Sequence, residues 1–293
     1  MTTNILAGIE LGGTKCICTL GTGPGDVRDQ QTVPTTTPDE TLDAIAAILA
    51  RWWADTPFAA LGIASFGPVD LNRASPTWGY IVNTSKPNWS MTDVARRLSA
   101  PYDVPVVFDT DVNGAAAAEM AWGAGQGLSD FAYITVGTGV GVGLIVNGRP
   151  TRGFGHCELG HLRVPRVDTG PSGCPFHDDC VEGLASGPGI HAALDGRPVA
   201  EAGPGDPIWD RVASAVATLC HAIIVTAAPP RIALGGGVIT RQPHLLPRIE
   251  PMLRASLNGY LALPDAPLIV APSLGEQAGP LGPIALARAA AAA

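Results

Sequence analysis

Two cysteines and a histidine stand three residues apart in one short segment of the chain. Cys174, His177 and Cys180 follow the spacing C-x-x-H-x-x-C, and thiolate sulfur and imidazole nitrogen are ligands that zinc prefers. The segment is rich in Gly, Pro and Asp and poor in apolar side chains, so a bound metal would supply order that packing does not. An earlier side chain such as His161 can close a tetrahedron. The pattern therefore predicts a structural metal site.

Three glycine-rich turns each follow a segment that is predicted to be a strand. They are Gly12-Gly13-Thr14-Lys15, Gly137-Thr138-Gly139 and Gly235-Gly236-Gly237. Successive backbone N–H groups in such turns form nests that bind anions, and the threonine hydroxyls and the lysine add donors. Taken alone, the third run is equally typical of a tight turn into a helix. No G-x-x-x-x-G-K-[ST] or G-x-G-x-x-G sequence occurs. Together the turns predict a polyphosphate ligand between two lobes, bound by neither of those standard motifs.

Two carboxylates lie at positions where they could act on a ligand: Glu10 shortly before the first glycine turn, and Asp111 at the end of another predicted strand. Asp111 follows a buried strand at residues 104–108 and precedes a helix that begins near Asn113, so it is either a general base or a cap of that helix. Glu10 lies within a strongly apolar run, where an unpaired carboxylate would be unfavourable, and this favours a functional role such as holding Mg²⁺ through water.

The elements that position these residues alternate between strands and helices. A strand, a glycine turn bearing Thr and a second strand occur twice, at residues 4–20 and again at residues 131–146, which indicates a duplicated unit. Further strands are expected at 60–66, 104–108, 231–234 and 268–272, and helices at 39–53, 91–99, 113–122, 207–227, 247–258 and 277–293. The alternation predicts an α/β fold with mixed sheets. We expect an N-terminal lobe of residues 1–114, completed by the helix at 277–293, and a C-terminal lobe of residues 115–276 that carries the metal loop.

Composition excludes several classes of protein. Of 293 residues, 46% are hydrophobic and only 15% are charged, which excludes a disordered chain. The 18 basic against 26 acidic residues leave a net charge of −8, which argues against binding to nucleic acid or to an anionic membrane. No basic n-region opens the chain, and the apolar stretch at 212–230 is interpreted as a buried helix. We expect a soluble cytoplasmic protein.

The motifs in combination resemble the ROK family of sugar kinases. The resemblance is carried by the runs at residues 8–15, 109–113, 137–141 and 156–161 and by the later Cys/His cluster, and it extends over nearly the whole chain. Within that family, Gly79-Tyr80-Ile81, Lys86-Pro87-Asn88-Trp89 and Cys174-Pro175-Phe176-His177 are most similar to the bacterial fructokinase branch. The resemblance implies the actin/hexokinase-like fold, with two ribonuclease-H-like lobes around a cleft.

The resemblance also implies roles for individual residues. Asp111 would be the base that takes the proton from the sugar hydroxyl, although the chain reads Thr110-Asp111 where many relatives read Asn-Asp. Glu158, His161 and Glu182 match sugar ligands of the family, with Asn88 a further contact and Trp89 either a wall for the sugar or a core residue. The implied ATP contacts are Gly12, Gly13, Thr14, Lys15, Thr138, Gly139, Gly236 and Gly237. The implied zinc ligands are His161, Cys174, His177 and Cys180, with His161 preferred to its rivals His156 and Cys157 because of its position in the motif.

These expectations lead to an ATP-dependent kinase that uses Mg²⁺ and a structural Zn²⁺ and converts fructose to fructose 6-phosphate. Mannose, glucose or N-acetylmannosamine remain as alternative substrates. A transcriptional repressor is disfavoured because the first phosphate turn begins so early in the chain, and a non-catalytic sugar sensor because the base and the turns are intact. The resemblance suggests a homodimer.

Overall fold

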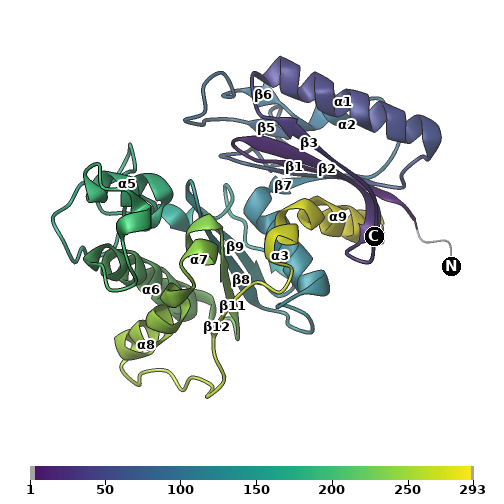
Figure 1. The fold of residues 1–293 in the computed structure, drawn as a ribbon. Helices are drawn as coiled ribbons and strands as arrows, with labels where there is room; N and C mark the ends of the chain where they lie inside the picture. The colour runs from purple at the N-terminus through teal and green to yellow at the C-terminus, as the bar shows by residue number, and fades with distance from the viewer. Residues whose placement is uncertain (1–3, 292–293) are drawn as a thin grey trace. The chain divides into compact units, whose positions relative to one another are not determined.

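The computed structural model describes residues 4–291, and the chain divides into two compact units (Figure 1). Unit 1 comprises Met1–Gln126, Thr151–His156 and Leu274–Ala293, and unit 2 comprises Gly127–Pro150 and Cys157–Ser273. The division after Gln126 falls later than the expected one after residue 114. The reason is that helix α3, Asp111–Trp122, packs along its length on the C-terminal helix α9, Ala278–Ala291, and so belongs with unit 1.

Unit 1 is built on a five-stranded sheet with the order β3-β2-β1-β4-β7. Strands β1 and β2 form the antiparallel hairpin expected around the first glycine turn, and β4 and β7 extend the sheet in parallel with β1. Strand β3 was not expected from the sequence. The strands are β1 Leu6–Leu11, β2 Lys15–Gly23, β3 Asp26–Pro34, β4 Leu61–Ser65 and β7 Val106–Thr110.

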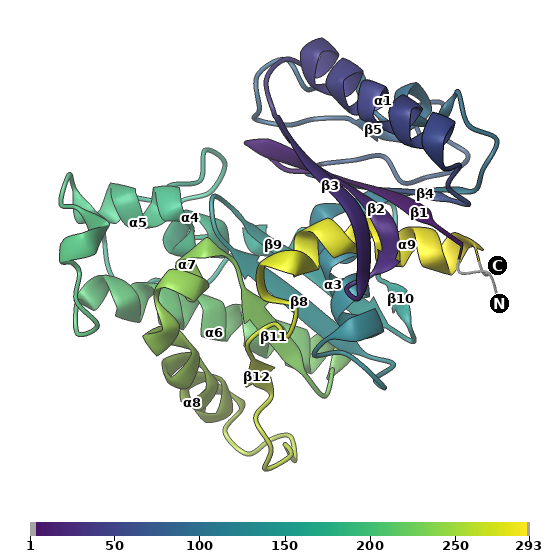
Figure 2. The same ribbon diagram turned by 45° about the vertical axis from the view of Figure 1, so that its right-hand side comes forward.

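Helices cover both faces of this sheet (Figure 2). Helix α1, Pro38–Asp55, lies on one face; it begins at the N-cap Thr37, has proline in its first turn, and buries Leu42, Ile45 and Leu49 against the strands. Helices α3 and α9 lie on the other face. Helix α9 approaches the sheet closely because β4 offers a glycine there: a Cβ at Gly62 would overlap the carbonyl oxygen of Pro283.

A short two-stranded sheet replaces part of the helix that the sequence predicted over residues 91–99. Strand β6, Thr92–Asp93, pairs with β5, Tyr80–Ile81, and only Ala95–Ser99 is helical, as α2. The expected helix was therefore wrong in its first half, because pairing with the distant β5 takes precedence over the local preference of these residues.

Unit 2 has a second five-stranded sheet with the same pattern, in the order β10-β9-β8-β11-β12. Strands β8 and β9 form the second antiparallel hairpin, and β11 and β12 continue in parallel with β8. The duplication inferred from the two Thr-bearing turns is thus present in the topology. The strands are β8 Phe131–Val136, β9 Val140–Val146, β10 Arg149–Pro150, β11 Ile232–Gly235 and β12 Ile269–Val270.

The core of unit 2 is centred on the long helix α6, Pro207–Ala227. Within the described chain this is the one helix that is long and apolar enough to cross a membrane, and 67% of its most apolar window is buried inside the structure. It packs against α4 and α8. The remaining helices of the unit are α4 Val181–Ala185, α5 Gly187–Leu194, α7 Gly237–Arg241 and α8 Leu246–Leu257. Single-turn 3₁₀ helices lie at Leu159–His161, Val199–Glu201, Pro243–Leu245 and, in unit 1, Gly275–Gln277.

The buried carboxylate of Glu119 accepts hydrogen bonds from two segments of unit 1, one where the chain leaves the unit and one where it returns. Glu119 of α3 is fully buried; its Oε2 accepts from Ala124 N at 2.6 Å and its Oε1 accepts from Leu274 N at 2.8 Å. Burying a carboxylate is unfavourable unless donors satisfy it, and the two amides do so here. The segment before Gly127 and the segment after Ser273 are therefore both fixed to α3.

Candidate active site and metal centre

Asp111 lies where strand β7 passes directly into helix α3. The strand continues to Thr110 and the helix starts at Asp111, two residues earlier than expected. The capping role considered for Asp111 belongs instead to Thr110, whose Oγ1 accepts from Asn113 N at 3.2 Å. Asp111 is half-buried, and its Oδ1 accepts from Val112 N at 2.8 Å. The structure thus places the proposed base at a strand end, in the first turn of a helix, where a negative charge is stabilised.

An ion pair between the buried Asp109 and the partly exposed Arg152, which the sequence patterns did not indicate, lies directly beside Asp111. Asp109 is 1% exposed; its Oδ1 accepts from Thr110 N and from the side-chain amide of Asn113, both at 2.8 Å. Its Oδ2 lies 2.5 Å from the guanidinium of Arg152. Asp109 therefore holds residues on both sides of Asp111. No local pattern signals the pair, since its members are 43 residues apart.

Glu10, in β1, is largely buried near the first turn of helix α9. A Cβ at Gly279 would overlap its Oε1, so the carboxylate lies against the start of that helix. Burial, and secondarily the charge of Asp111, raises the pKa of Glu10 to about 7, while the nearby Lys15 ammonium opposes the rise. Glu10 and Asp111 thus form a pair of interacting carboxylates within unit 1.

The first glycine turn follows β1 directly and presents an exposed surface. Gly12 N donates to Lys15 O at 3.1 Å and closes the turn, which leaves Gly13, Thr14 and Lys15 exposed. A second lysine reaches it: Lys86 Nζ donates to Gly13 O at 2.6 Å. The turn combines backbone amides, a hydroxyl and two ammonium groups, which is the chemistry of an anion site.

The loop after β5 carries Asn88 at its surface and Trp89 in the core. Trp89 is fully buried, its Nε1 donates to Thr36 O at 2.9 Å, and its ring packs edge-on against Phe66. Of the two interpretations of Trp89, the core residue is the one found. Asn88 is exposed and adopts a φ of 69°. The buried indole thus anchors a loop whose polar residue faces solvent.

In unit 2 the second and third glycine turns lie side by side. Gly137 N donates to Gly139 O at 2.8 Å, and a Cβ at Gly236 would overlap the backbone of Val136 immediately before that turn. Gly236 has a φ of 88°, and Gly237 begins α7. Thr138 is exposed at the tip. The third run is therefore a turn into a helix and also a neighbour of the Thr138 turn.

Glu182 connects this turn with the predicted sugar ligands. Its Oε2 accepts from Val140 N at 3.0 Å, and its Oε1 lies 4.0 Å from His161 Nε2. Glu158 precedes the 3₁₀ turn that carries His161 and is exposed. Glu182, at the start of α4, therefore lies next to His161 of the Glu-x-x-His segment within unit 2.

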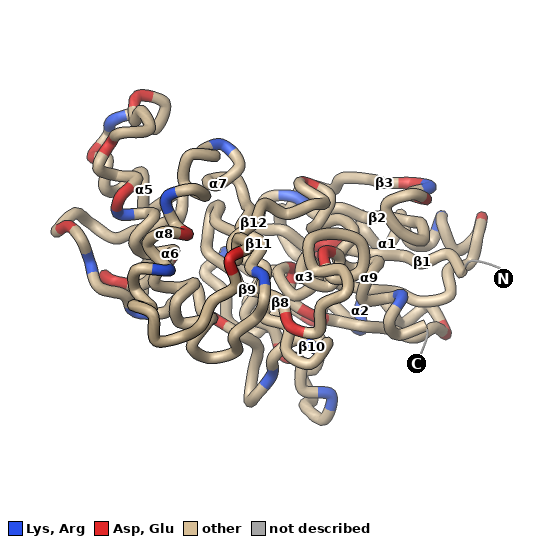
Figure 3. Tube along the Cα trace, turned by 90° about the horizontal axis from the view of Figure 1, so that it is seen from below, with Lys and Arg blue, Asp and Glu red and all other residues tan. Residues whose placement is uncertain are grey.

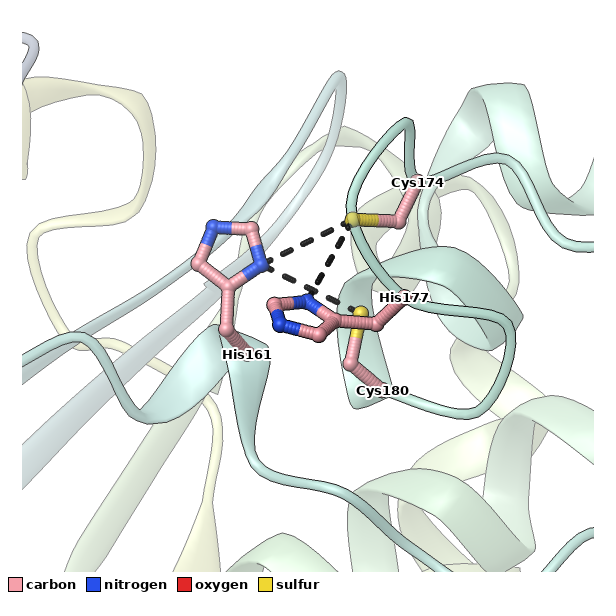
Figure 4. Close-up of side chains that lie close together, drawn as sticks. All are labelled: His161, Cys174, His177 and Cys180. Atoms are coloured by element: carbon pink, nitrogen blue, oxygen red, sulfur yellow. Dashed lines mark hydrogen bonds between the residues drawn. The ribbon is translucent and has the colours of Figure 1, made fainter. Parts of the chain in front are cut away.

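The four predicted metal ligands converge (Figure 4). Their ligand atoms all lie within 4.8 Å of one another. Cys174 Sγ lies 3.7 Å from His161 Nδ1 and 3.8 Å from His177 Nδ1, and Cys180 Sγ lies 3.9 Å from His161 Nδ1. In a tetrahedral zinc centre a sulfur and a nitrogen ligand are separated by about 3.6 Å. The cluster therefore has the donor set and the spacing of a closed metal site.

The cluster distinguishes the two nitrogens of His161. Nδ1 faces the sulfur atoms, while Nε2 faces Glu182. Burial raises the pKa of the Cys180 thiol to about 11, so the thiolate needs a cation to form at neutral pH, and a metal ion would supply it. Of the two rival ligands, His156 is engaged elsewhere: its Nε2 accepts from Val69 N at 3.0 Å in unit 1. Cys157 lies outside the cluster.

The loop that carries the metal ligands is also held by arginines. Arg166 donates to the carbonyl oxygens of Gly170 and Asp178. The buried Arg211 of α6 donates to Asp168 at 3.0 Å and to the carbonyl oxygen of Pro171. The sequence predicted that order in this loop would depend on the metal; these contacts show that hydrogen bonds contribute as well.

The model of the ROK family matches residues 6–290. The chain belongs to the ROK family. Among its relatives, fructokinase from Pediococcus pentosaceus is 39% identical over 293 residues, covering 98% of each chain, and fructokinase from Zymomonas mobilis is 41% identical over 96% of each. A ROK family glucokinase from Streptomyces griseus, solved in complex with glucose and AMPPNP, superimposes with a TM-score of 0.75 at 26% identity, covering 97% of this chain and 99% of the other.

Family membership gives this ROK protein the actin/hexokinase-like fold that its motifs implied. The two sheets with matching strand order are the duplicated halves of that fold. Unit 1 brings together Asp111, Glu10 and the Lys15 turn, and unit 2 brings together the Thr138 turn and the metal cluster.

Proposed function

We propose that this ROK protein is an ATP-dependent kinase that transfers the γ-phosphoryl group to D-fructose and forms fructose 6-phosphate. The observation that carries the proposal is the 39% and 41% identity, over nearly the whole chain, to relatives named fructokinase. Asp111 lies at a strand end, and the charges of both Asp111 and Lys15 of the first glycine turn act on Glu10 in the same unit, which supports the reaction class.

Asp111 is proposed to act as the general base. The 6-hydroxyl of fructose gives its proton to the Asp111 carboxylate while its oxygen forms a bond to the γ-phosphorus of ATP. The bond from that phosphorus to the β,γ-bridging oxygen breaks, and ADP leaves with the electron pair. The proton then passes from Asp111 to solvent. A positioned base contributes about 10²–10⁴ to the rate.

The phosphates of ATP are assigned to the glycine turns. In unit 1, the amide of Gly13, the hydroxyl of Thr14 and the ammonium of Lys15 supply donors, while the Gly12 amide closes the turn by donating to Lys15 O. In unit 2, the Thr138 turn and the amides at the start of α7 do so. Mg²⁺ would spread the charge of the phosphates, and the oxygen donors of Glu10 suit that hard cation.

The sugar is assigned to Glu158, His161 and Glu182 of unit 2 and to Asn88 of unit 1. Carboxylate and imidazole groups at fixed angles recognise adjacent hydroxyls, because each accepts or donates along a defined direction. His161 offers Nε2 for this purpose, since its Nδ1 faces the cysteines.

The metal is proposed to be zinc, held by His161, Cys174, His177 and Cys180. Two thiolates and two imidazoles with these separations are a structural zinc set, and such a closed set leaves no position for substrate. Zinc would fix the tautomer and the orientation of His161 and so orient its second nitrogen. We further propose that the enzyme is a homodimer of the cytoplasm.

The test is the rate of ADP release with MgATP across fructose, mannose, glucose and N-acetylmannosamine. The proposal expects the highest kcat/KM for fructose. Preference for another hexose keeps the reaction and overturns the substrate. Absence of turnover with all four, on folded and zinc-loaded protein, overturns the kinase and favours a sugar sensor.

A further inference from the structure

Lysine is almost absent from this chain. Among its 18 basic residues, 16 are arginine and two are lysine. Lysine and arginine are both blue in Figure 3 and lie at many places along the chain, and all but two of these positions are arginine. The two lysines, Lys15 and Lys86, are 71 positions apart in the sequence, yet both belong to the first glycine turn: one is its last residue and the other binds its Gly13 carbonyl oxygen.

The placement of both lysines at the first glycine turn indicates that this turn requires an ammonium group. Arginine serves as the cation nearly everywhere else in the chain, so a general preference for lysine does not explain the pair. An ammonium is a compact point charge with three donors, whereas a guanidinium is a wide planar fork. A small cation can approach the exposed turn beside Gly13, where a Cβ would have no neighbour within 4 Å.

The loop that carries Lys86 is built to hold its side chain in place. The buried side chain of Trp89 anchors the loop in the core of unit 1. Within the loop, Lys86 N donates to Thr84 Oγ1 at 3.3 Å, and Trp89 N donates to Lys86 O at 3.3 Å. At the far end of the side chain, Nζ is fixed on Gly13 O at 2.6 Å. That bond uses one of the three N–H donors, and no second acceptor is bonded to Nζ among residues 4–291.

We propose that Lys86 is a phosphate-binding residue that donates to a non-bridging oxygen of the β- or γ-phosphate of ATP. This inference rests on the proposed kinase function and adds a residue to it. A neutral sugar has no need of a second ammonium, whereas a polyphosphate does. Since Asn88 lies two residues further along the same anchored loop, the loop joins the nucleotide contact to the assigned sugar contact.

A binding experiment tests the contact without depending on turnover. Incorporation of [ζ-¹⁵N]lysine labels only Lys15 and Lys86 and leaves their N–H donors intact, and Lys86→Arg identifies the Lys86 signal by its loss. The proposal expects this signal to shift on addition of Mg·AMPPNP and to stay in place with adenosine, which has no phosphate. A Lys86 signal that stays in place at saturating Mg·AMPPNP overturns the proposal, whether or not the protein phosphorylates fructose.

Kinetics distinguish phosphate binding from mere support of the loop. Lys86→Met should lower kcat/KM for MgATP about 10- to 100-fold, the range for loss of a hydrogen bond to a charged group, and should change KM for fructose less than about twofold. Lys86→Arg, which keeps the charge, should fall between wild type and Lys86→Met. Arg51→Met, which removes an exposed cation of α1, is the matched control and should leave both constants unchanged.

Either of two kinetic outcomes contradicts the assignment. One is an unchanged kcat/KM for MgATP in Lys86→Met. The other is a rise in KM for fructose alone together with a lower melting temperature, which is the result expected if Lys86 only supports the Asn88 loop. Failure of the wild-type enzyme to phosphorylate any hexose would instead count against the proposed function, and the labelling experiment would then decide on Lys86.

Discussion

Glu10→Gln should stabilise this protein at alkaline pH and have little effect at acid pH. Burial against the start of α9, together with the charge of Asp111, raises the pKa of Glu10 from the ordinary 4.5 to about 7. A carboxyl whose pKa is higher in the folded than in the unfolded chain holds its proton longer in the folded state. The folded protein therefore loses stability as the pH rises from about 4.5 through about 7.

The size of the effect follows from the difference between the two pKa values. That difference corresponds to at most about 3 kcal/mol in the free energy of unfolding. The start of α9 favours the ionised form and reduces the cost, so the expected range is about 1–3 kcal/mol. Glutamine has the shape of the protonated acid and carries no charge at any pH, so the variant avoids this loss.

The assay is urea unfolding of wild type and Glu10→Gln at pH 4.5, 6 and 8 without nucleotide. The advantage of the variant should be near zero at pH 4.5 and should reach about 1–3 kcal/mol at pH 8. With saturating MgATP at pH 8 the advantage should shrink, because a cation close to Glu10 stabilises its charge. A difference between the proteins that is independent of pH, or that is largest at pH 4.5, would contradict a raised pKa of Glu10 in the folded protein.

Two further predictions concern the metal centre and the Asp109–Arg152 ion pair. Cys174→Ser should bind far less zinc than the roughly one ion per chain expected of wild type, whereas Cys157→Ser, which lies outside the cluster, should keep its zinc. Elemental analysis measures the zinc content of both variants. Equal zinc in the two variants would remove Cys174 from the ligand set. Arg152→Met leaves Asp109 buried without its cation and should lower the free energy of unfolding by about 1–3 kcal/mol, discounted because Arg152 is 42% exposed. The double variant with Asp109→Asn should recover part of that loss in the same urea titration, and a double variant as unstable as the sum of the single variants would show that the pair does not interact.

Local sequence patterns were sufficient for the features built from neighbouring residues. The spacing of Cys174, His177 and Cys180 predicted a cluster, and the structure brings these side chains together with His161. The two Thr-bearing glycine turns predicted the duplicated hairpins, because a hairpin forms from adjacent residues.

Features made by distant residues were not visible in the sequence. Asp109 with Arg152, His156 with Val69 N and Glu119 with Leu274 N join positions 43, 87 and 155 residues apart, and no periodicity carries such a pairing. Their role is also structural: they fix the β7–α3 turn and the segments where the chain passes between units, and such tasks leave no motif.

Some elements were missed because their residues do not show the expected pattern. Strand β3 lies at the edge of its sheet and exposes most of a polar run, so the alternation of apolar residues that marks a strand is weak. Helices α4 and α5 are short; α4 contains a glycine and α5 contains two glycines and a proline, residues that are typical of loops.

The most direct test of the account compares fructose 6-phosphate formation by wild type and by Asp111→Asn, followed by ³¹P NMR with MgATP and fructose. We expect turnover by wild type and a kcat at least about 100-fold lower in the variant, while calorimetry shows fructose and MgATP binding unchanged. A variant that forms fructose 6-phosphate at nearly the wild-type rate would contradict the assignment of Asp111 as the base. A wild-type protein that binds both ligands and forms no product would contradict the kinase itself.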